Sequence, residues 1–260
     1  MLCPKCNKVL FRVDNTYKCP NNHSYDIAKE GYVNLLLSRT ASGDDKDLVN
    51  GRIEFLNTGF YEPLQSRLEK IITDLSPNND IKLLDMGCGT GYYTSAFGKI
   101  ATTFGLDISK EAIKYAAKHD KNSTYLVASN KNAPFESHTF DFLVHIFSPI
   151  FENEDIRLLK NGGFLILVEA GPKHLIELKN LLYENTYFNE EKSHIFPTLK
   201  IVEKFSLKYS KEIDQTALKN LVKMTPYFYT TKKENFSALN VDKKILLTID
   251  FSVSIFKAVF

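Results

Sequence analysis

A glycine-rich loop after Asp85 constrains the fold of this chain more than any other feature. The apolar run before the loop ends at this carboxylate, Gly87, Gly89 and Gly91 follow at alternate positions, and an apolar pattern typical of a helix comes next. Glycine permits positive φ angles and lets the backbone approach a bound nucleoside. The next apolar run ends at Asp107, where such folds hold ribose hydroxyls. The sequence therefore predicts a cofactor loop at the first strand-to-helix turn of a parallel α/β sheet.

The spacing of the glycines indicates which cofactor the loop binds. Dinucleotide-binding sequences read G-x-G-x-x-G, whereas this loop reads G-x-G-x-G directly after Asp85. The pattern resembles the first motif of the S-adenosylmethionine-dependent methyltransferases, in which the loop passes beneath the methionine part of the cofactor. Asp107 is the stronger candidate of the two acids for cofactor binding. The alternative is a tight structural turn, with Asp107 only capping a helix over 109–119.

A second feature, at the N-terminus, predicts a metal site. Cys3, Cys6, Cys19 and His23 follow the spacing C-x₂-C-x₁₂-C-x₃-H, which offers three thiolates and one imidazole to a tetrahedral zinc ion. Such a closed site has no open position for water, so the zinc is expected to be structural. A disulfide is the weaker alternative in a cytosolic chain with an odd number of cysteines in this segment. Cys88 lies within the glycine loop, where a small residue suffices.

Composition and hydropathy are consistent with a cytoplasmic enzyme. The chain has 260 residues, 43% hydrophobic and 25% charged, enough for a main domain and a smaller unit. Its net charge of +2 gives no electrostatic argument for nucleic acid. No apolar run reaches the length of a membrane span, and the N-terminus carries no apolar signal segment. We therefore expect a cytoplasmic location and no membrane partner.

The chain divides into a zinc-binding unit at 1–37, a linker or hinge at 38–58, and a larger domain at 59–260. Apolar runs predict strands at 81–86, 102–107, 123–128, 140–147 and 163–169. Periodic patterns predict helices from about residue 48, around 64–75, and near 91–99, 109–119, 151–159, 172–185 and 214–223. Extended segments are expected at 200–209 and 246–258. This alternation predicts an α/β, Rossmann-like class I methyltransferase sheet with a small N-terminal zinc-binding domain.

Motifs spread over nearly the whole chain make the resemblance more specific. They are the zinc knuckle with the run 28–36 (AKEGYVNLL), and the segments 43–44, 55–64, 85–93, 103–110 and 171–175. Together they resemble the bacterial ribosomal RNA guanine-N1 methyltransferases. The resemblance implies methyl transfer from S-adenosylmethionine to N1 of a guanine in a hairpin of the large-subunit (23S) RNA. It also implies that the zinc unit recognises RNA.

The resemblance also implies which residues contact the cofactor. These are Tyr61, Gly89, Thr90 and His174 beside Asp107, together with Asp85 and Gly87 of the loop. Without the resemblance, Tyr61 would be read as a packed aromatic and His174 as a first-turn helix residue. The specific guanine and the oligomeric state lie beyond the sequence, and a homodimer is an open alternative.

The catalytic base is not identified by the sequence. Guanine N1 carries a proton in the neutral base, so methylation needs an unpaired or extruded base and a route for that proton. Asp26, Glu30 and His145 are candidates, and a structural role is the alternative for each. Two other functional classes also stay open. These are a small-molecule methyltransferase, which the shared cofactor half allows, and a noncatalytic RNA-binding protein that retains the pocket.

Overall fold

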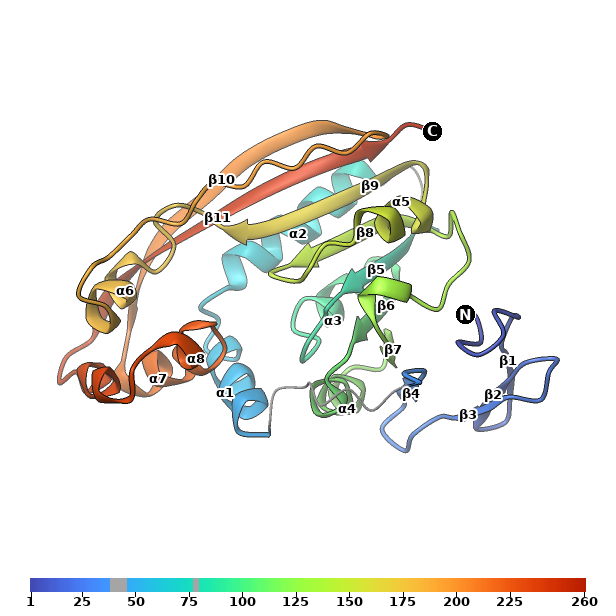
Figure 1. The fold of residues 1–260 in the computed structure, drawn as a ribbon, viewed down its shortest axis with the longest axis horizontal. Helices are drawn as coiled ribbons and strands as arrows, with labels where there is room; N and C mark the ends of the chain where they lie inside the picture. Colours follow the sequence, from blue (N-terminus) through green and yellow to red (C-terminus); the bar gives the residue numbers. More distant parts are fainter. Residues whose placement is uncertain (38–45, 77–79) are drawn as a thin grey trace.

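A computed structural model describes residues 1–37, 46–76 and 80–260 (Figure 1). Strands of a large sheet in these ranges are β4 (Val33–Asn34), β5 (Lys82–Met86), β6 (Thr102–Asp107), β7 (Thr124–Val127), β8 (Phe140–Ile146), β9 (Leu159–Ala170), β10 (Leu199–Ile213) and β11 (Ile245–Ala258). The helices are α1 (Lys46–Leu56), α2 (Glu62–Leu75), α3 (Thr94–Phe97), α4 (Lys110–His119), α5 (Glu152–Leu158), α6 (Ile176–Leu182), α7 (Gln215–Lys223) and α8 (Tyr227–Thr230). Short 3₁₀ turns are η1 (Asn130–Asn132) and η2 (Lys233–Leu239).

The large sheet has the order expected of a doubly wound methyltransferase. Within the described residues its strands run β10-β11-β9-β8-β5-β6-β7-β4. The strands from β4 to β9 pair in parallel, whereas β11 is antiparallel to both β9 and β10. Strand order reverses beside β5, between β6 and β8, and ligands of such sheets bind at the carboxyl ends next to this switch point. The predicted fold class is therefore confirmed.

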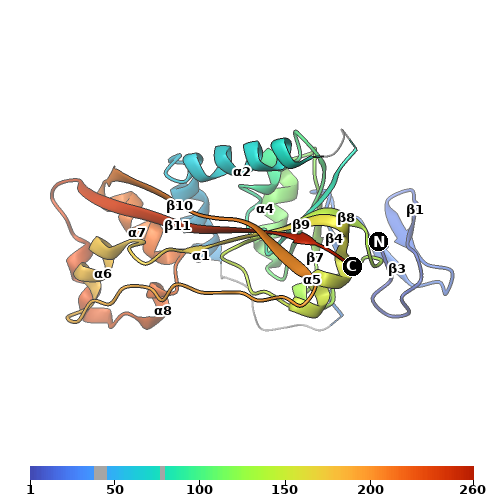
Figure 2. The same ribbon diagram turned by 90° about the horizontal axis from the view of Figure 1, so that it is seen from above.

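Helices cover both faces of this sheet. Figure 2 shows α2 and α4 on one face and α5 on the other. The amphipathic α2 illustrates why: its buried positions recur every three or four residues, at Leu64, Leu68, Ile71 and Ile72. Burial of each such side chain contributes about 1.5–3 kcal/mol. The central strands are buried on both faces, which explains their nearly continuous apolar runs.

Two predicted helices are shorter than expected. The segment predicted at 172–185 forms α6 only over Ile176–Leu182, because Leu175 adopts a left-handed conformation with φ of 55° directly before it. The segment predicted at 91–99 forms the four-residue α3, because the positive φ of Gly91 delays the start of the helix. Within the described parts of the chain, no helix has the length and apolar character needed to cross a bilayer.

A helical lobe lies beyond the carboxyl ends of the central strands. The long β10 and β11 reach this lobe, which contains α6, α7 and α8 (Figure 1). Helix α1 packs against α7, so the interval 38–58 that we expect to be a linker includes a helix with a buried side. Residues 38–45 of that interval lie outside the described residues.

The N-terminal unit is a small antiparallel sheet of β1 (Phe11–Val13), β2 (Thr16–Lys18) and β3 (Ser24–Asp26). It lies beside the β4 edge of the large sheet, at the end of the molecule away from the helical lobe (Figures 1 and 2). The chain then enters the large sheet, where β4 pairs in parallel with β7. The last residues of the interval 1–37 thus pack with the larger domain, and the division into domains stays a prediction.

Candidate cofactor site and zinc site

The glycine loop after β5 has the backbone conformation that its sequence predicts. Gly87, Gly89 and Gly91 have φ angles of 82°, 53° and 77°, which side-chain-bearing residues rarely adopt. A Cβ on Gly87 would lie 2.6 Å from the Ser148 Cβ, and one on Gly91 would lie 2.7 Å from the Tyr125 hydroxyl. At Gly89 the nearest atom would be 3.7 Å away. That nearest atom belongs to the side chain of Arg52, so Gly89 is required by its positive φ and not by tight packing.

The two acids next to the loop differ in their surroundings. Asp107, at the end of β6, accepts hydrogen bonds from the backbone N–H groups of Gly89 (2.9 Å) and Ser109 (2.7 Å), and its side chain is half-buried. These two bonds hold the carboxylate at the carboxyl end of β6, beside the glycine loop. Asp85 is buried and accepts from Thr94 Oγ1 at 2.6 Å. Burial raises the pKa of Asp85 to about 7 despite this hydrogen bond.

Tyr61 and His174 are 113 residues apart in the sequence and meet in the interior. The Tyr61 hydroxyl lies 3.4 Å from His174 Nε2, and both side chains are at least 95% buried. The backbone N–H of Asp250 donates to His174 Nδ1 at 3.3 Å, so Nε2 carries the ring proton and donates to the Tyr61 oxygen. Burial lowers the pKa of His174 to about 4. The imidazole is therefore neutral near pH 7, and the Tyr61 hydroxyl proton is free to donate to a ligand.

The turn that carries His174 is fixed by a buried carboxylate on β11. Asp250 is fully buried and accepts from the backbone N–H of Lys173 at 3.0 Å and from Ser206 Oγ at 2.7 Å. A Cβ on Gly171 would lie 2.6 Å from the Asp250 Cγ. Asp250 therefore acts through the turn, as a positioning residue for His174.

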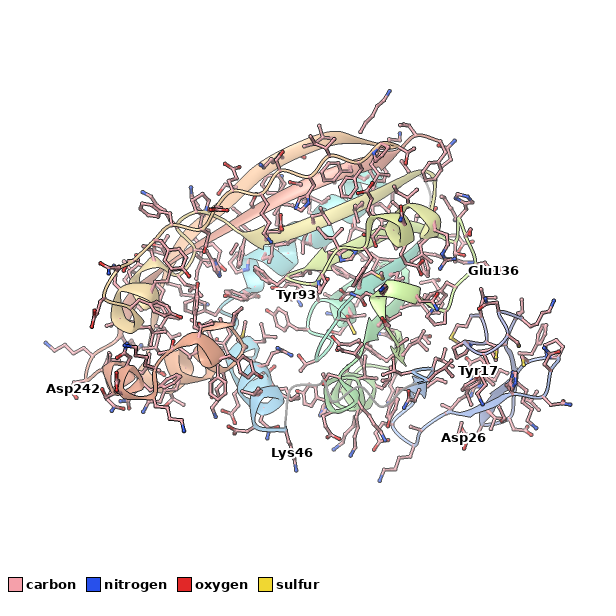
Figure 3. The ribbon with its side chains drawn as sticks, viewed as in Figure 1. Tyr17, Asp26, Lys46, Tyr93, Glu136 and Asp242 are labelled. Carbon is pink, nitrogen blue, oxygen red and sulfur yellow. The ribbon has the colours of Figure 1, made fainter. Side chains whose placement is uncertain are left out.

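Tyr93 supplies a test of whether the site fits a cofactor. Its side chain is 9% exposed, yet its hydroxyl has no hydrogen-bond partner among the described residues. A buried hydroxyl without a partner is costly, so its presence indicates a ligand group that completes the bond. In Figure 3, Tyr93 lies beside the carboxyl end of β8. The positive φ angles of the glycine loop, the carboxylate of Asp107 at the end of β6 and this hydroxyl fit a nucleoside that carries an amino-acid group.

Thr90 lines a cavity on the side of the loop next to α1 and α4. The residue is 6% exposed, and the cavity is bounded by Leu56 of α1 and His119 of α4. Of the residues that we expect to contact the cofactor, the structure thus groups Gly87 and Gly89 with Asp107, and Tyr61 with His174. Thr90 belongs to the same loop but its surroundings are those of the α1–α4 side.

The predicted zinc ligands come together in the N-terminal unit. One ligand atom from each of Cys3, Cys6, Cys19 and His23 lies within 4.8 Å of all the others. Cys6 and Cys19 are 3.6 Å apart at sulfur, and His23 Nδ1 is 3.4 Å from the sulfurs of Cys3 and Cys19. A tetrahedral site with Zn–S bonds of 2.3 Å has edges of about 3.8 Å, so this donor set fits zinc. The Tyr25 hydroxyl, 3.2 Å from the Cys3 sulfur, adds an outer hydrogen bond that the spacing alone did not predict.

The three candidate bases do not meet at this site. Asp26 is exposed on β3, and Figure 3 places it on the other side of α4 from Tyr93. The backbone carbonyl of Glu30 accepts from Lys121, which follows the C-terminus of α4 and thus lies at the opposite edge of the sheet from the loop. His145 is 2% exposed, and its nitrogens contact Ser148 Oγ at 3.0 Å and Asp155 Oδ1 at 3.2 Å. The buried contacts of His145 favour a structural role, and the positions of Asp26 and Glu30 place neither beside the cofactor residues.

Sequence reasoning missed Tyr93, Asp250 and Phe147 as members of this region. Tyr93 follows the glycine loop directly, so its position in the sequence could have indicated a place in the site. That its hydroxyl is left without a partner among the described residues depends on packing, which the sequence does not show. Asp250 interrupts an apolar strand with a carboxylate, which marks a buried polar network once the strand is known to be central. Phe147 gave no signal, because phenylalanine rarely adopts the positive φ that it has here.

The fold and the loop define a class I, S-adenosylmethionine-dependent methyltransferase domain joined to an N-terminal zinc ribbon. Residues 84–167 match the family described as a methyltransferase domain, and residues 1–38 match the family described as RlmA, N-terminal. The chain is 31% identical to the Bacillus subtilis protein named putative 23S rRNA (guanine-N(1)-)-methyltransferase YxjB, over 97% of this chain and 95% of that protein. The chain therefore belongs to the family of RlmA-like 23S rRNA (guanine-N1)-methyltransferases.

Other similarities agree with this membership. The chain is 29% identical to the 23S rRNA (guanine(748)-N(1))-methyltransferase of Streptomyces fradiae, over 86% of this chain and 84% of that protein. The crystal structure of the YcgJ protein of Bacillus subtilis superimposes with a TM-score of 0.51 and 16% identity, over 74% of this chain and 98% of that one. The latter shows the fold alone. The cofactors of this chain are accordingly S-adenosylmethionine and a structural zinc ion.

Proposed function

We propose that this protein transfers a methyl group from S-adenosylmethionine to N1 of a guanine in a hairpin of 23S ribosomal RNA. One observation carries the proposal: the zinc ribbon and the methyltransferase domain occur together in one chain that aligns over 97% of its length with a relative named for this reaction. A small-molecule methyltransferase needs only the second of these units. The ribbon therefore favours RNA as the substrate.

We assign cofactor binding to residues from four segments, namely Tyr61, Asp85, Gly87, Gly89, Thr90, Asp107 and His174, with Thr90 included as a member of the glycine loop. Asp107 would hold the ribose, because its half-buried carboxylate ends β6 and is held beside the glycine loop by the N–H groups of Gly89 and Ser109. Gly89 would let the loop keep its positive φ beside the cofactor. Tyr61 would donate its hydroxyl proton to the amino-acid end, and neutral His174 would fix its orientation. Asp85 would act through Thr94 and the loop.

The bound S-adenosylmethionine supplies an activated methyl group on its sulfonium, so the protein needs chiefly to align donor and acceptor. The residues of this chain serve that need in two ways. The glycine loop and Asp107 fix the nucleoside at the carboxyl ends of β5 and β6. The buried pair Tyr61 and His174 excludes water beside the loop after β9. No carboxylate or imidazole with a free acceptor faces this site among the candidate bases, so the catalytic base is not assigned.

The N-terminal unit would bind RNA rather than take part in the chemistry. We propose that Cys3, Cys6, Cys19 and His23 hold the zinc ion and thereby fix β1 to β3. Exposed Lys5, Lys8, Arg12 and Lys18 offer phosphate contacts on this unit. A location in the cytoplasm, where ribosomal RNA is modified in bacteria, is part of the proposal, and a homodimer stays a prediction.

Mapping of ribosomal RNA tests the proposed function directly. A methyl group on guanine N1 blocks Watson–Crick pairing, so reverse transcription stops at the modified base, and mass spectrometry of the digested RNA identifies N1-methylguanine. We expect one stop in 23S RNA that is present in cells with the protein and absent without it. Identical stops and identical N1-methylguanine content in both strains would contradict the proposal.

A further inference from the structure

Phe147 combines a strained backbone with an exposed aromatic ring at the carboxyl end of β8. Its φ angle is 55°, a conformation that bulky side chains rarely adopt, and its side chain is 48% exposed. Strain of this kind persists only where the surroundings enforce it, and it concentrates at functional sites. Neither burial nor a turn sequence explains the residue, since glycine or asparagine would serve the same backbone with less strain.

A buried network enforces this conformation from the next residue. Ser148 Oγ donates to the carbonyl of Met86, the last residue of β5, and His145 Nδ1 lies 3.0 Å from the same hydroxyl. The other nitrogen of His145 contacts the fully buried Asp155 of α5. The Phe147 backbone N–H donates to Val168 of β9 at 3.0 Å. The turn is thus tied to β5, β9 and α5 at once.

The ring of Phe147 lies between the cofactor residues and open solvent. Its centroid is 6.0 Å from the His174 ring and 5.8 Å from the Phe251 ring, so one side is packed against the interior. Ser148, the next residue, would be 2.6 Å from a Cβ on Gly87. The ring therefore adjoins His174 of the Tyr61–His174 pair, the next residue adjoins the glycine loop, and part of the ring surface stays exposed.

We infer that Phe147 is the platform on which the target guanine stacks during methyl transfer, an inference that rests on the proposed function. The acceptor nitrogen must come next to the methyl donor, and an extruded base that has lost its stacking neighbours needs an aromatic face in their place. Among the described aromatic side chains in contact with His174, Phe147 alone has an exposed side chain, since Tyr61 and Phe251 are both buried. His145 and Asp155 act as positioning residues that hold this ring.

The experiment compares Phe147→Ala with Phe147→Tyr and Phe147→Trp on a hairpin fragment of 23S RNA. Each stack lost costs about 5- to 150-fold in equilibrium terms, so kcat/KM of Phe147→Ala should fall within that range. Both aromatic variants should retain most of it. The loss should come mainly through KM, because stacking stabilises the bound base before and during transfer. Calorimetry should find unchanged S-adenosylmethionine affinity, which separates the role of the ring from a folding defect.

A fluorescent base gives a readout that a structural role would not change. With 2-aminopurine in place of the target guanine, stacking on wild-type protein should quench the fluorescence, and Phe147→Ala should leave it unquenched at saturating RNA. Phe188→Ala is the control, since this exposed aromatic lies between α6 and β10. It should behave as wild type in both assays.

The outcomes separate this inference from the proposed function. Wild-type kcat/KM and full quenching in Phe147→Ala would overturn the stacking role and leave the RNA reaction standing. Equal losses in Phe147→Ala, Phe147→Tyr and Phe147→Trp would also overturn it, because an aromatic face would then not be what matters. No transfer to RNA by the wild-type protein would overturn both proposals together.

Discussion

The zinc ribbon and the large sheet are stabilised by different means. In the ribbon, residues 1–27, the buried apolar side chains are Cys3, Leu10 and Cys19, two of which are predicted metal ligands. The large sheet instead has fully buried strands, such as Leu83 and Leu84 of β5, and helices on both faces. A unit this small cannot bury enough surface to fold alone, so metal replaces the missing core. The comparison predicts that each unit can unfold without the other, the ribbon on loss of its metal and the large sheet on disruption of its packed core.

Loss of the metal should have the largest effect and should be confined to the ribbon. Structural zinc contributes about 10–16 kcal/mol of apparent binding free energy in small zinc units. Cys6→Ser should therefore not bind zinc, and its residues up to about 27 should become disordered. The backbone amides of β4 should stay protected from hydrogen exchange, because this strand pairs with β7. Elemental analysis and hydrogen exchange measure both parts. Cys88→Ser, outside the cluster, is the control, and protection of residues 1–27 in metal-free Cys6→Ser would refute the comparison.

Overpacking should instead destabilise the large sheet. Ala at Gly91 would need a positive φ and would place its Cβ 2.7 Å from the Tyr125 hydroxyl and 2.8 Å from the Ala116 Cβ. We expect Gly91→Ala to lower the free energy of unfolding by about 2–5 kcal/mol. Gly162→Ala has a similar φ of 81° but no atom within 4 Å, so it isolates the backbone cost of about 1–2 kcal/mol. Urea unfolding of both variants tests this, and equal losses would show that contact at Gly91 is unimportant.

Removal of the Asp107 carboxylate should act on the cofactor more than on either fold. Asp107→Ala deletes a charged acceptor for the ribose and two bonds to backbone N–H groups, at a cost of about 1.5–3 kcal/mol, or 10- to 150-fold in S-adenosylmethionine affinity. Calorimetric titration measures the loss. Asp107→Asn keeps a neutral acceptor and should lose less. Unchanged affinity in Asp107→Ala would mean that the ribose is held elsewhere.

The smallest effect concerns the pH dependence of the large sheet. The pKa of His174 is about 4 in the folded protein and 6.5 in the unfolded chain, because burial disfavours the imidazolium. Stability from this group is complete above pH 6.5 and is lost as pH falls toward 4, by about 2 kcal/mol at pH 5. The free-energy difference between wild type and His174→Asn should therefore shrink by that amount between pH 7.5 and 5. His119→Asn, at the exposed end of α4, is the control. A constant difference would contradict the buried neutral state.

Elements that bury apolar side chains were predicted from the sequence more reliably than features that depend on strand pairing or on one residue's backbone conformation. Strands β5 to β9 and β11 were predicted because burial leaves apolar runs in the sequence. The extended segment predicted at 200–209 lies within β10, although most side chains of that strand are exposed or half-buried. The addition of β4 to the large sheet was not predicted, because a pair of residues, Val33 and Asn34, carries no periodicity. The left-handed conformation of Leu175, which shortens α6, likewise leaves no sequence signal, because leucine lacks the preference of glycine and asparagine for positive φ.

The candidate site divides in the same way. Local spacing located the glycine loop, Asp107 and the zinc cluster, since each depends on a short stretch of chain. The meeting of Tyr61 with His174 depends on the packing of distant elements, and only the resemblance suggested it. Packing also decides that the Tyr93 hydroxyl has no partner among the described residues and that Phe147 stays half exposed. Spacing carries no information on either.

The central claim is that the ribbon binds RNA and the large sheet binds the cofactor. It is tested most directly by measuring cofactor binding and RNA methylation in one ribbon variant. Cys6→Ser is titrated with S-adenosylmethionine and then tested for transfer of a labelled methyl group to a 23S RNA hairpin, with Asp107→Ala beside it. We predict that Cys6→Ser binds the cofactor as the wild type does but does not methylate the RNA, whereas Asp107→Ala loses affinity and activity together. Methylation of the hairpin at the wild-type rate by zinc-free Cys6→Ser would contradict the account.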